Sequence, residues 1–227
     1  ENMKINVLSL FDGMSCGRVA LDRAKIPVDK YYASEIDKYA IQVSEENYPD
    51  IERLGDVTEW REWSMDWASI DLLIAGSPCQ GFSFSGKQLA FDDPRSALFF
   101  VFVDILNHIN KERALVGKKE VSFLLENVRM KKEYLAVISE RVGVEPVFIN
   151  SNLLSAQNRP RYYWANCDFA PPADRGLMLA DIVLDEVDEK YIISEKYKNR
   201  LSVSEDLKKR FSAINPNKAL CMTARQY

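Results

Sequence analysis

The stretch INVLSLFDGMSCG, residues 5 to 17, joins a short apolar run to a tight turn that contains Gly13 and Gly17. The apolar run predicts a buried strand, and the turn predicts the start of a helix. The spacing is not the GxGxxG of a dinucleotide fingerprint, so the glycine pair alone is a weak signal. Because ligands of open α/β sheets bind beyond the carboxyl ends of the strands, the turn is a candidate binding loop.

The same alternation of apolar runs and amphipathic stretches continues through the first 166 residues. It predicts an α/β fold, a doubly wound and mostly parallel sheet of Rossmann-like type with helices on both faces. The predicted strands are Ile5 to Leu10, Lys30 to Ser34, Leu72 to Ala75, Val121 to Leu125, Val147 to Asn150 and Tyr162 to Ala165. The predicted helices are Arg18 to Ala24, Lys38 to Asn47, Ala97 to Asn110 and Lys132 to Arg141.

A domain boundary is predicted at FAPPADRG, residues 169 to 176, where two prolines and a glycine interrupt the alternation. We predict a catalytic domain over residues 3–170 and a second, smaller region over 174–227. Glu1 and Asn2 precede Met3, which we interpret as the natural start. Within the first domain, EWREWSMDW repeats tryptophan at helical spacing at positions 60, 63 and 67, and we interpret this as a packing face, not a base-stacking platform.

Composition narrows the class of protein. The chain has 227 residues, 47% of them hydrophobic, and a net charge of −4, which argues against binding nucleic acid through general positive charge but not against a locally basic cleft. The sequence has no apolar run of roughly 18 residues, so we expect no membrane contact and a cytoplasmic location. Four scattered cysteines and a single histidine predict neither a disulfide framework nor a metal site.

Two acids follow predicted strands in the first domain. Glu35 in YYASEID lies at the tip of the second strand, where a carboxylate can grip a ribose diol. Asp56 in LGDVTEW follows a third short strand and can accept from an adenine amino group, with Val57 lining the pocket. Taken singly, each acid is equally well explained as an ordinary surface residue.

The segment DLLIAGSPCQGFSFSGKQ, residues 71 to 88, is the most specific signal. An apolar strand ends at Gly76, and Cys79 follows on a loop between proline and glycine, a position typical of a reactive thiol, not a packed one. The glycine- and serine-rich stretch that follows, residues 81 to 88, is a candidate lid over bound substrate.

Further charged groups follow at later strands. FLLENV, residues 123 to 128, places Glu126 at the end of another buried strand, on the same sheet edge as Cys79. QNRPRYYWAN, residues 157 to 166, places Arg159 and Arg161 on one side of an extended approach, where guanidinium groups can hold carbonyls or phosphates. Each charge alone is equally consistent with a salt bridge, but a thiol, an acid and two arginines at consecutive strand ends favour a site.

Together, the segments FDGMSCG, SEID, GDV, GSPCQGFSFSGKQ, ENV and QNRPRYYW resemble, in order and spacing, the motifs of DNA cytosine-5 methyltransferases of bacterial or phage type, over residues 3 to 166. The resemblance implies S-adenosylmethionine (SAM) as methyl donor, S-adenosylhomocysteine as product and no metal. It implies a catalytic set of Cys79, Glu126, Arg159 and Arg161. It implies a SAM-binding set of Phe11, Asp12, Gly13, Ser15, Gly17, Glu35, Ile36, Asp56, Val57, Pro78 and Leu98.

The implied reaction is methylation of cytosine C5 in double-stranded DNA through a covalent bond between Cys79 and C6 of a flipped-out base. The same resemblance implies a monomer, a restriction endonuclease as a possible system partner and a chain truncated before or within its target recognition region. Three alternatives stay open: an RNA substrate, a non-enzymatic regulatory module, and a SAM-dependent enzyme of small molecules. The recognition sequence is not encoded in the motifs.

Overall fold

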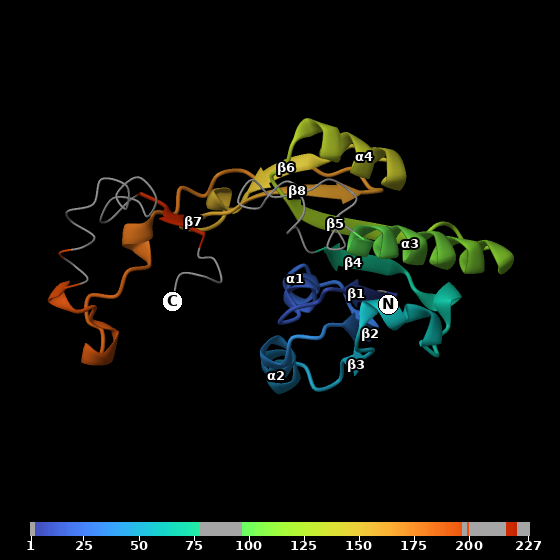
Figure 1. Cartoon of the computed structure of the whole chain (residues 1–227), viewed down its shortest axis with the longest axis horizontal. Coiled ribbons are helices and arrows are strands. Elements are labelled where there is room, and N and C mark those ends of the chain that lie inside the picture. Colours follow the sequence, from blue (N-terminus) through green and yellow to red (C-terminus); the bar gives the residue numbers. More distant parts are fainter. Residues whose placement is uncertain (1–2, 78–96, 197–198, 200–216, 222–227) are drawn as a thin grey trace. The chain divides into compact units, whose positions relative to one another are not determined.

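The computed structural model describes residues 3–77, 97–196, 199 and 217–221. Its main element is a seven-stranded sheet with the order β3-β2-β1-β4-β5-β8-β6 (Figure 1). The strands are β1 (Ile5–Leu10), β2 (Val28–Ser34), β3 (Glu52–Arg53), β4 (Leu72–Gly76), β5 (Ser122–Val128), β6 (Val147–Asn150) and β8 (Pro160–Ala165). The predicted doubly wound α/β fold is therefore confirmed.

The strand order reverses direction between β1 and β4. Both strands pair in parallel, β1 with β2 on one side and β4 with β5 on the other. In doubly wound sheets the ligand binds at this switch point, beyond the carboxyl ends of the strands. The loop that begins at Phe11 and the segment that begins at Ser77 follow these two strands, so both candidate motifs of the sequence start at the switch point.

Four helices cover the two faces of the sheet. Figure 1 shows α1 (Cys16–Arg23) and α2 (Lys38–Asn47) on one face, and α3 (Ala97–Leu115) and α4 (Lys132–Val142) on the other. Asp37 caps α2 by accepting from two backbone N–H groups of its first turn. Gly143, with φ of 76°, ends α4 in the left-handed conformation that glycine adopts without strain.

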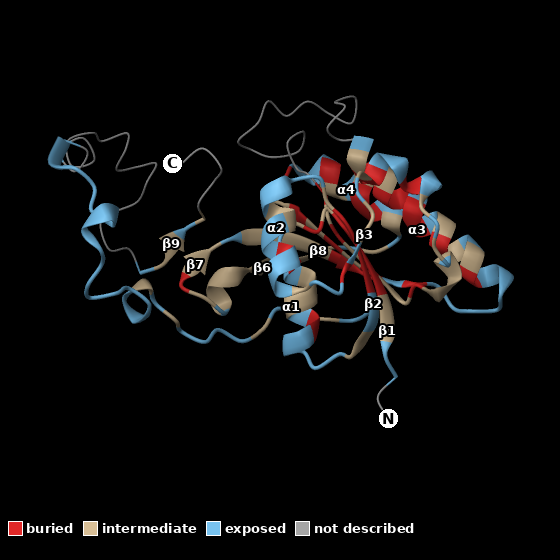
Figure 2. Cartoon of the chain, turned by 90° about the horizontal axis from the view of Figure 1, so that it is seen from below, coloured by how far each residue is buried: buried red, intermediate tan, exposed pale blue. Residues whose placement is uncertain are grey.

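Alternation along the strands gives each face its own core. On β1, Leu8 and Leu10 join the larger cluster against α3 and α4, whereas Val7 packs with Leu21 of α1 and Tyr31 of β2. Successive side chains of a strand point to opposite faces, which explains the division. Figure 2 shows these buried positions concentrated along the sheet and on the inner side of α3.

The tryptophan segment forms two short 3-10 turns, η1 (Val57–Glu62) and η2 (Trp67–Ser69). The Trp60 ring lies edge-on to Trp67, with 5.7 Å between centroids, and 5.2 Å from the ring of His108 on α3. Trp63 stacks on Trp67 at 6.2 Å. The segment packs against α3, and the prediction of a packing face is confirmed.

The chain divides into two compact units, residues 1–147 with 162–169, and residues 148–161 with 170–227. The second unit contains a small parallel pairing of β7 (Gln157–Asn158) with β9 (Ala219–Leu220). Residues 148–161, which fall within the predicted catalytic domain, group here with the C-terminal part. In the described part of the chain, no helix has the length and apolar content needed to cross a membrane.

Candidate functional site

The loop after β1 is held in a strained conformation by buried polar groups. Phe11 and Ser15 have φ of 55° and 63°, in the left-handed region that costs non-glycine residues roughly 1–2 kcal/mol each. The fully buried Ser15 hydroxyl donates to Asp12 Oδ2 and lies 2.5 Å from Ser44 Oγ of α2. Tyr31 Oη donates to Asp12 Oδ1 at 2.8 Å. Strain of this kind persists only where the surroundings hold it, and this network does so.

Tyr31 is one of the two hydroxyl donors to Asp12. Its ring is buried on β2, and burial, followed by the negative charge of Asp12, raises the pKa of Tyr31 far above its usual value. The phenol therefore stays protonated at any physiological pH. Each of the two carboxylate oxygens of Asp12 accepts from a hydroxyl group, which fixes the turn that follows β1.

Gly17 permits the close approach of α1 to the sheet, and we expect Gly17→Ala to destabilise the protein. An added Cβ would lie 2.9 Å from Tyr31 Oη and 3.3 Å from Ile74 Cδ1. Overpacking of this kind costs about 1–3 kcal/mol in free energy of unfolding, measurable by urea denaturation.

Tyr31→Phe is the matched partner variant for Gly17→Ala, because it removes Tyr31 Oη, the oxygen that the added Cβ would meet. The double variant should lose less than the sum of the two single losses. Strictly additive losses, or an unchanged free energy in Gly17→Ala, would show that the close approach does not matter.

Three turns at the carboxyl ends of β1, β2 and β3 are hydrogen-bonded into one rim. Gly13 N donates to Glu35 Oε2 at 2.8 Å, which ties the first turn to the second. Ser34 Oγ donates to the carbonyl of Gly55 at 2.7 Å, which ties the second turn to the third. The acids that the sequence selected, Glu35 and Asp56, therefore lie on one connected rim.

The rim has a hydrogen-bond acceptor position and an exposed apolar side chain that suit a nucleoside. Glu35 accepts three backbone N–H groups, from Gly13, Ile36 and Asp37. Since a carboxylate has about four acceptor positions, one further donor such as a ribose hydroxyl fits without displacing them. The Ile36 side chain beside it is 72% exposed, an apolar surface on which a planar base can pack.

Asp56 has a free acceptor of its own. Its Oδ1 accepts from the amide and the hydroxyl of Thr58, both at 2.8 Å, which caps η1. Its Oδ2 accepts no hydrogen bond from the described residues, so it is available to an amino group. Val57, the next residue, is 6% exposed and packs in the core, and its place beside a bound adenine stays a prediction.

Glu126 lies on β5, beside the end of β4, the strand that precedes Ser77 and the Cys79 segment. β4 and β5 pair in parallel with Gly76 opposite Glu126. A Cβ on Gly76 would lie 3.3 Å from Glu126 Oε2, so the carboxylate lies directly over that strand end. Gly76 and Glu126 thus lie side by side at one sheet edge, and the convergence of Glu126 with Cys79 stays a prediction. Cys79, Pro78 and the candidate lid at 81–88 lie outside the described residues, and Leu98 is partly buried against the core at the start of α3.

Asn127 is a residue of this edge whose function sequence reasoning missed. It is 1% exposed, and its Nδ2 donates to Ser77 Oγ at 2.9 Å. Its Oδ1 accepts from the amide of Val128 at 2.8 Å. Ser77 is also buried and precedes Cys79 by two residues. Asn127 therefore anchors the chain at Ser77, just before the Pro78-Cys79 motif in the sequence. Its place beside Glu126 in ENV was the only available signal.

The two predicted arginines belong to the second compact unit. Arg159 lies between β7 and β8, is exposed, and donates from Nη1 to Cys221 Sγ at 3.1 Å. Its backbone N–H donates to Asn150 Oδ1 at 2.9 Å. Arg161 lies on β8 and donates from Nη1 to the carbonyl of Pro160 at 2.8 Å. Their convergence on Glu126 stays a prediction.

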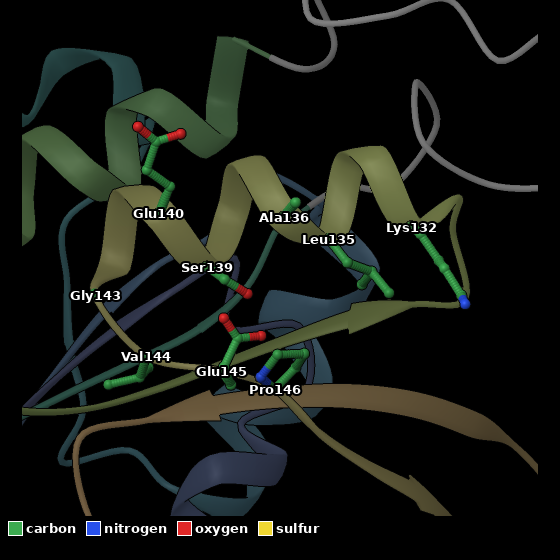
Figure 3. A pocket seen from close by; sticks show the side chains of 9 residues that line it. All are labelled: Lys132, Leu135, Ala136, Ser139, Glu140, Gly143, Val144, Glu145 and Pro146. Carbon is green, nitrogen blue, oxygen red and sulfur yellow. The ribbon is translucent and has the colours of Figure 1, made fainter.

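A groove of about 520 Å³ lies elsewhere, along α4 and the segment that follows it (Figure 3). Its lining includes Lys132, Ser139 and Glu145, and it contains none of the residues that the sequence selected. Figure 3 shows these side chains on α4 and on the turn that follows it. The candidate site is therefore the rim and the Glu126 edge, not this groove.

A doubly wound sheet with such a rim at its switch point defines a Rossmann-like domain of the SAM-dependent methyltransferase type. The solved structure of a DNMT2 mutant from Spodoptera frugiperda shares this fold, with a TM-score of 0.66 and 20% sequence identity over 97% of this chain and 70% of that one. The chain belongs to the C-5 cytosine-specific DNA methylase family, whose model matches residues 5–136.

Two curated relatives are similar over most of this chain. Type II methyltransferase M.NlaX of Neisseria lactamica is 35% identical over 211 residues, 84% of this chain and 63% of its own length. Type II methyltransferase M.NgoBV of Neisseria gonorrhoeae is 33% identical over 182 residues, 70% of this chain and 40% of its own length. The chain thus spans less than two thirds of either relative.

Proposed function

We propose that the protein transfers a methyl group from SAM to C5 of cytosine in double-stranded DNA. The observation that supports this most is the pairing of Gly76 with Glu126, which brings the end of the strand that precedes the PCQ segment and the ENV acid to one sheet edge at the switch point. That edge adjoins β1, whose loop belongs to the nucleoside-type rim. Family membership and this juxtaposition together favour cytosine C5 as the acceptor.

The rim residues fit SAM by the chemistry of their unused groups. Glu35 would accept from a ribose hydroxyl, Asp56 Oδ2 from the adenine amino group, and Ile36 would pack against the ring. The strained turn at Phe11 and Gly13 would border the cofactor, and Pro78 and Leu98 would lie near its methionine end. When bound, SAM supplies the electrophilic methyl group that C5 accepts.

The remaining chemistry falls to side chains of this chain. Cytosine C5 is a poor nucleophile, so the Cys79 thiolate adds to C6 and moves electron density to C5. Glu126 holds a proton at N3 and stabilises the charge that develops on the ring. After C5 is methylated, loss of its proton drives the Cys79 sulfur off C6 and restores the aromatic ring. The thiol leaves this cycle unchanged.

DNA engagement is assigned to groups around this edge. The target atoms are stacked within the duplex, so the base must flip out, and residues 81 to 88 would close behind it. Arg161 would bind the cytosine O2, and Arg159 would hold the loop or a phosphate. We propose a monomer in the bacterial or phage-infected cytoplasm, with a restriction endonuclease as a possible system partner.

Label transfer separates this function from its alternatives. The full-length protein is incubated with tritiated SAM and with duplex DNA, tRNA or small cytosine compounds. We expect label in duplex DNA alone. Label in tRNA would replace DNA as the substrate, and label in no acceptor despite measurable SAM binding would favour a regulatory module.

Glu35→Gln tests the cofactor rim. The amide keeps the shape of the side chain but removes the charge and one acceptor oxygen, which weakens the bonds to Gly13, Ile36 and Asp37 and to a ribose hydroxyl. We expect SAM to bind about tenfold more weakly, equivalent to about 1.4 kcal/mol, by isothermal calorimetry. Glu46→Gln, on the exposed surface of α2, is the matched control and should bind SAM normally. If both variants bound SAM with the same affinity, Glu35 would not be a SAM-binding residue.

A further inference from the structure

Lys218 is bound by three backbone carbonyls of the second unit. Its Nζ donates to Asn152 O at 2.7 Å, to Ser155 O at 3.0 Å and to Leu177 O. An ammonium group has three donors, so this side chain uses all of them on the protein backbone. A solvated surface lysine makes no such set of contacts. Lys218 therefore ties the turn before β7 to residue 177 and to its own strand.

The strand that follows Lys218 lies against the arginine motif. β9 pairs with β7 in parallel, with Ala219 opposite Gln157 and Leu220 opposite Asn158. Ala219 N donates to Ala156 O at 2.7 Å, which fixes this register. Arg159 and Cys221 directly follow the last paired residue of each strand, and Arg159 Nη1 donates to Cys221 Sγ at 3.1 Å.

The arginine is also held from the other side. Its backbone N–H donates to Asn150 Oδ1, and its carbonyl accepts from Ser151 N at 3.3 Å. These bonds fix its main chain, whereas the sulfur contact is made by the guanidinium itself. Residues 150 and 151 thus fix the main chain of Arg159, and Cys221 holds its guanidinium group.

We infer that residues 217–221 form a strap that positions Arg159 for the DNA substrate, with Lys218 fastening the strap and Cys221 orienting the guanidinium. The inference rests on the proposed function, in which Arg159 contacts the loop or a phosphate. Lys218 and Cys221 act through Arg159 and are positioning residues. Neither was selected by sequence analysis, because their partners lie 41 to 66 residues away in the chain.

The strap is tested first without reference to catalysis. Lys218→Met keeps the length of the side chain but removes the ammonium, so the strap should detach and expose Cys221. We expect N-ethylmaleimide to label Cys221 at least about threefold faster, read by peptide mass spectrometry, because local opening controls access to the thiol. Lys190→Met, which alters an exposed lysine paired with Asp188, is the control and should leave the labelling rate unchanged. An unchanged rate in Lys218→Met would overturn the strap.

A double-mutant cycle then tests the action through Arg159. We expect Lys218→Met to lower kcat/KM for DNA about tenfold or more, since small misplacements of a binding group are costly, and to leave SAM affinity unchanged. In an Arg159→Ala background the same change should have almost no further effect. Equal losses in both backgrounds would mean that Lys218 stabilises the fold without positioning Arg159, and would overturn the inference.

The two tests keep the two claims apart. If the wild-type protein methylates no acceptor, the proposed function fails. Cys221 labelling still decides whether the strap exists, because that readout needs no methyl transfer.

Discussion

Cys79→Ala is expected to abolish methyl transfer to DNA, with a loss in kcat on the order of 10⁴-fold or more. Alanine cannot add to C6, so C5 keeps the low reactivity of free cytosine even when the methyl donor and the base are both bound. The loss should fall on kcat, with SAM and DNA affinities nearly unchanged. Single-turnover assays with tritiated SAM, combined with calorimetric binding of SAM, separate the chemical step from binding.

Matched controls for Cys79 are available in the same chain. Cys16 and Cys167 are both exposed and outside any disulfide. Their alanine variants should retain near wild-type rates. If Cys79→Ala kept activity within about tenfold of wild type, covalent catalysis at this position would be excluded.

Glu126→Gln is expected to lower kcat by about 10²- to 10³-fold, the range typical of a lost general acid or base. The amide is similar in size to the carboxylic acid and fits the same place over Gly76, so we expect the free energy of unfolding to change little. It cannot transfer a proton to cytosine N3, and the negative charge that develops on the ring during thiol addition is then less stabilised. DNA binding should be affected far less than the rate.

Glu133→Gln is the control for this change, because Glu133 lies in the first turn of α4 in an exposed pair with Lys131. It should leave the rate unchanged. A Glu126→Gln variant with a wild-type rate would assign the acid a structural function and would leave the ring without its expected proton source.

Several elements of the fold could be predicted because the local signal was sufficient. The strand limits Ile5–Leu10 and Val147–Asn150 and the helix limits Lys38–Asn47 agree with the structure. Helix α3 continues to Leu115, past its predicted end at Asn110. Arg113 explains the difference: its buried side chain bonds to the carbonyls of Ile70 and Lys119, a tertiary contact that no local pattern reveals.

The candidate site could be predicted only as a set of strand ends. Glu35, Asp56 and Glu126 were found because acids at such positions are unusual in an otherwise apolar pattern. The buried polar pairs that fix the neighbouring turns could not be predicted, since Ser44 pairs with Ser15 across 29 residues and Asn127 with Ser77 across 50. Serine and asparagine are common in turns, so their burial becomes visible only when distant elements are packed together.

The most direct test of the central claim is trapping of the covalent bond to cytosine C6. Full-length protein is mixed with SAM and duplex DNA containing 5-fluorocytosine, in which fluorine replaces the proton that must leave C5, so that release of the thiol is blocked. We predict a denaturation-resistant protein–DNA adduct that forms in wild-type protein and is lost in Cys79→Ala. An adduct that persists in Cys79→Ala, or none across varied DNA sequences despite SAM binding, would contradict methylation of DNA cytosine through Cys79.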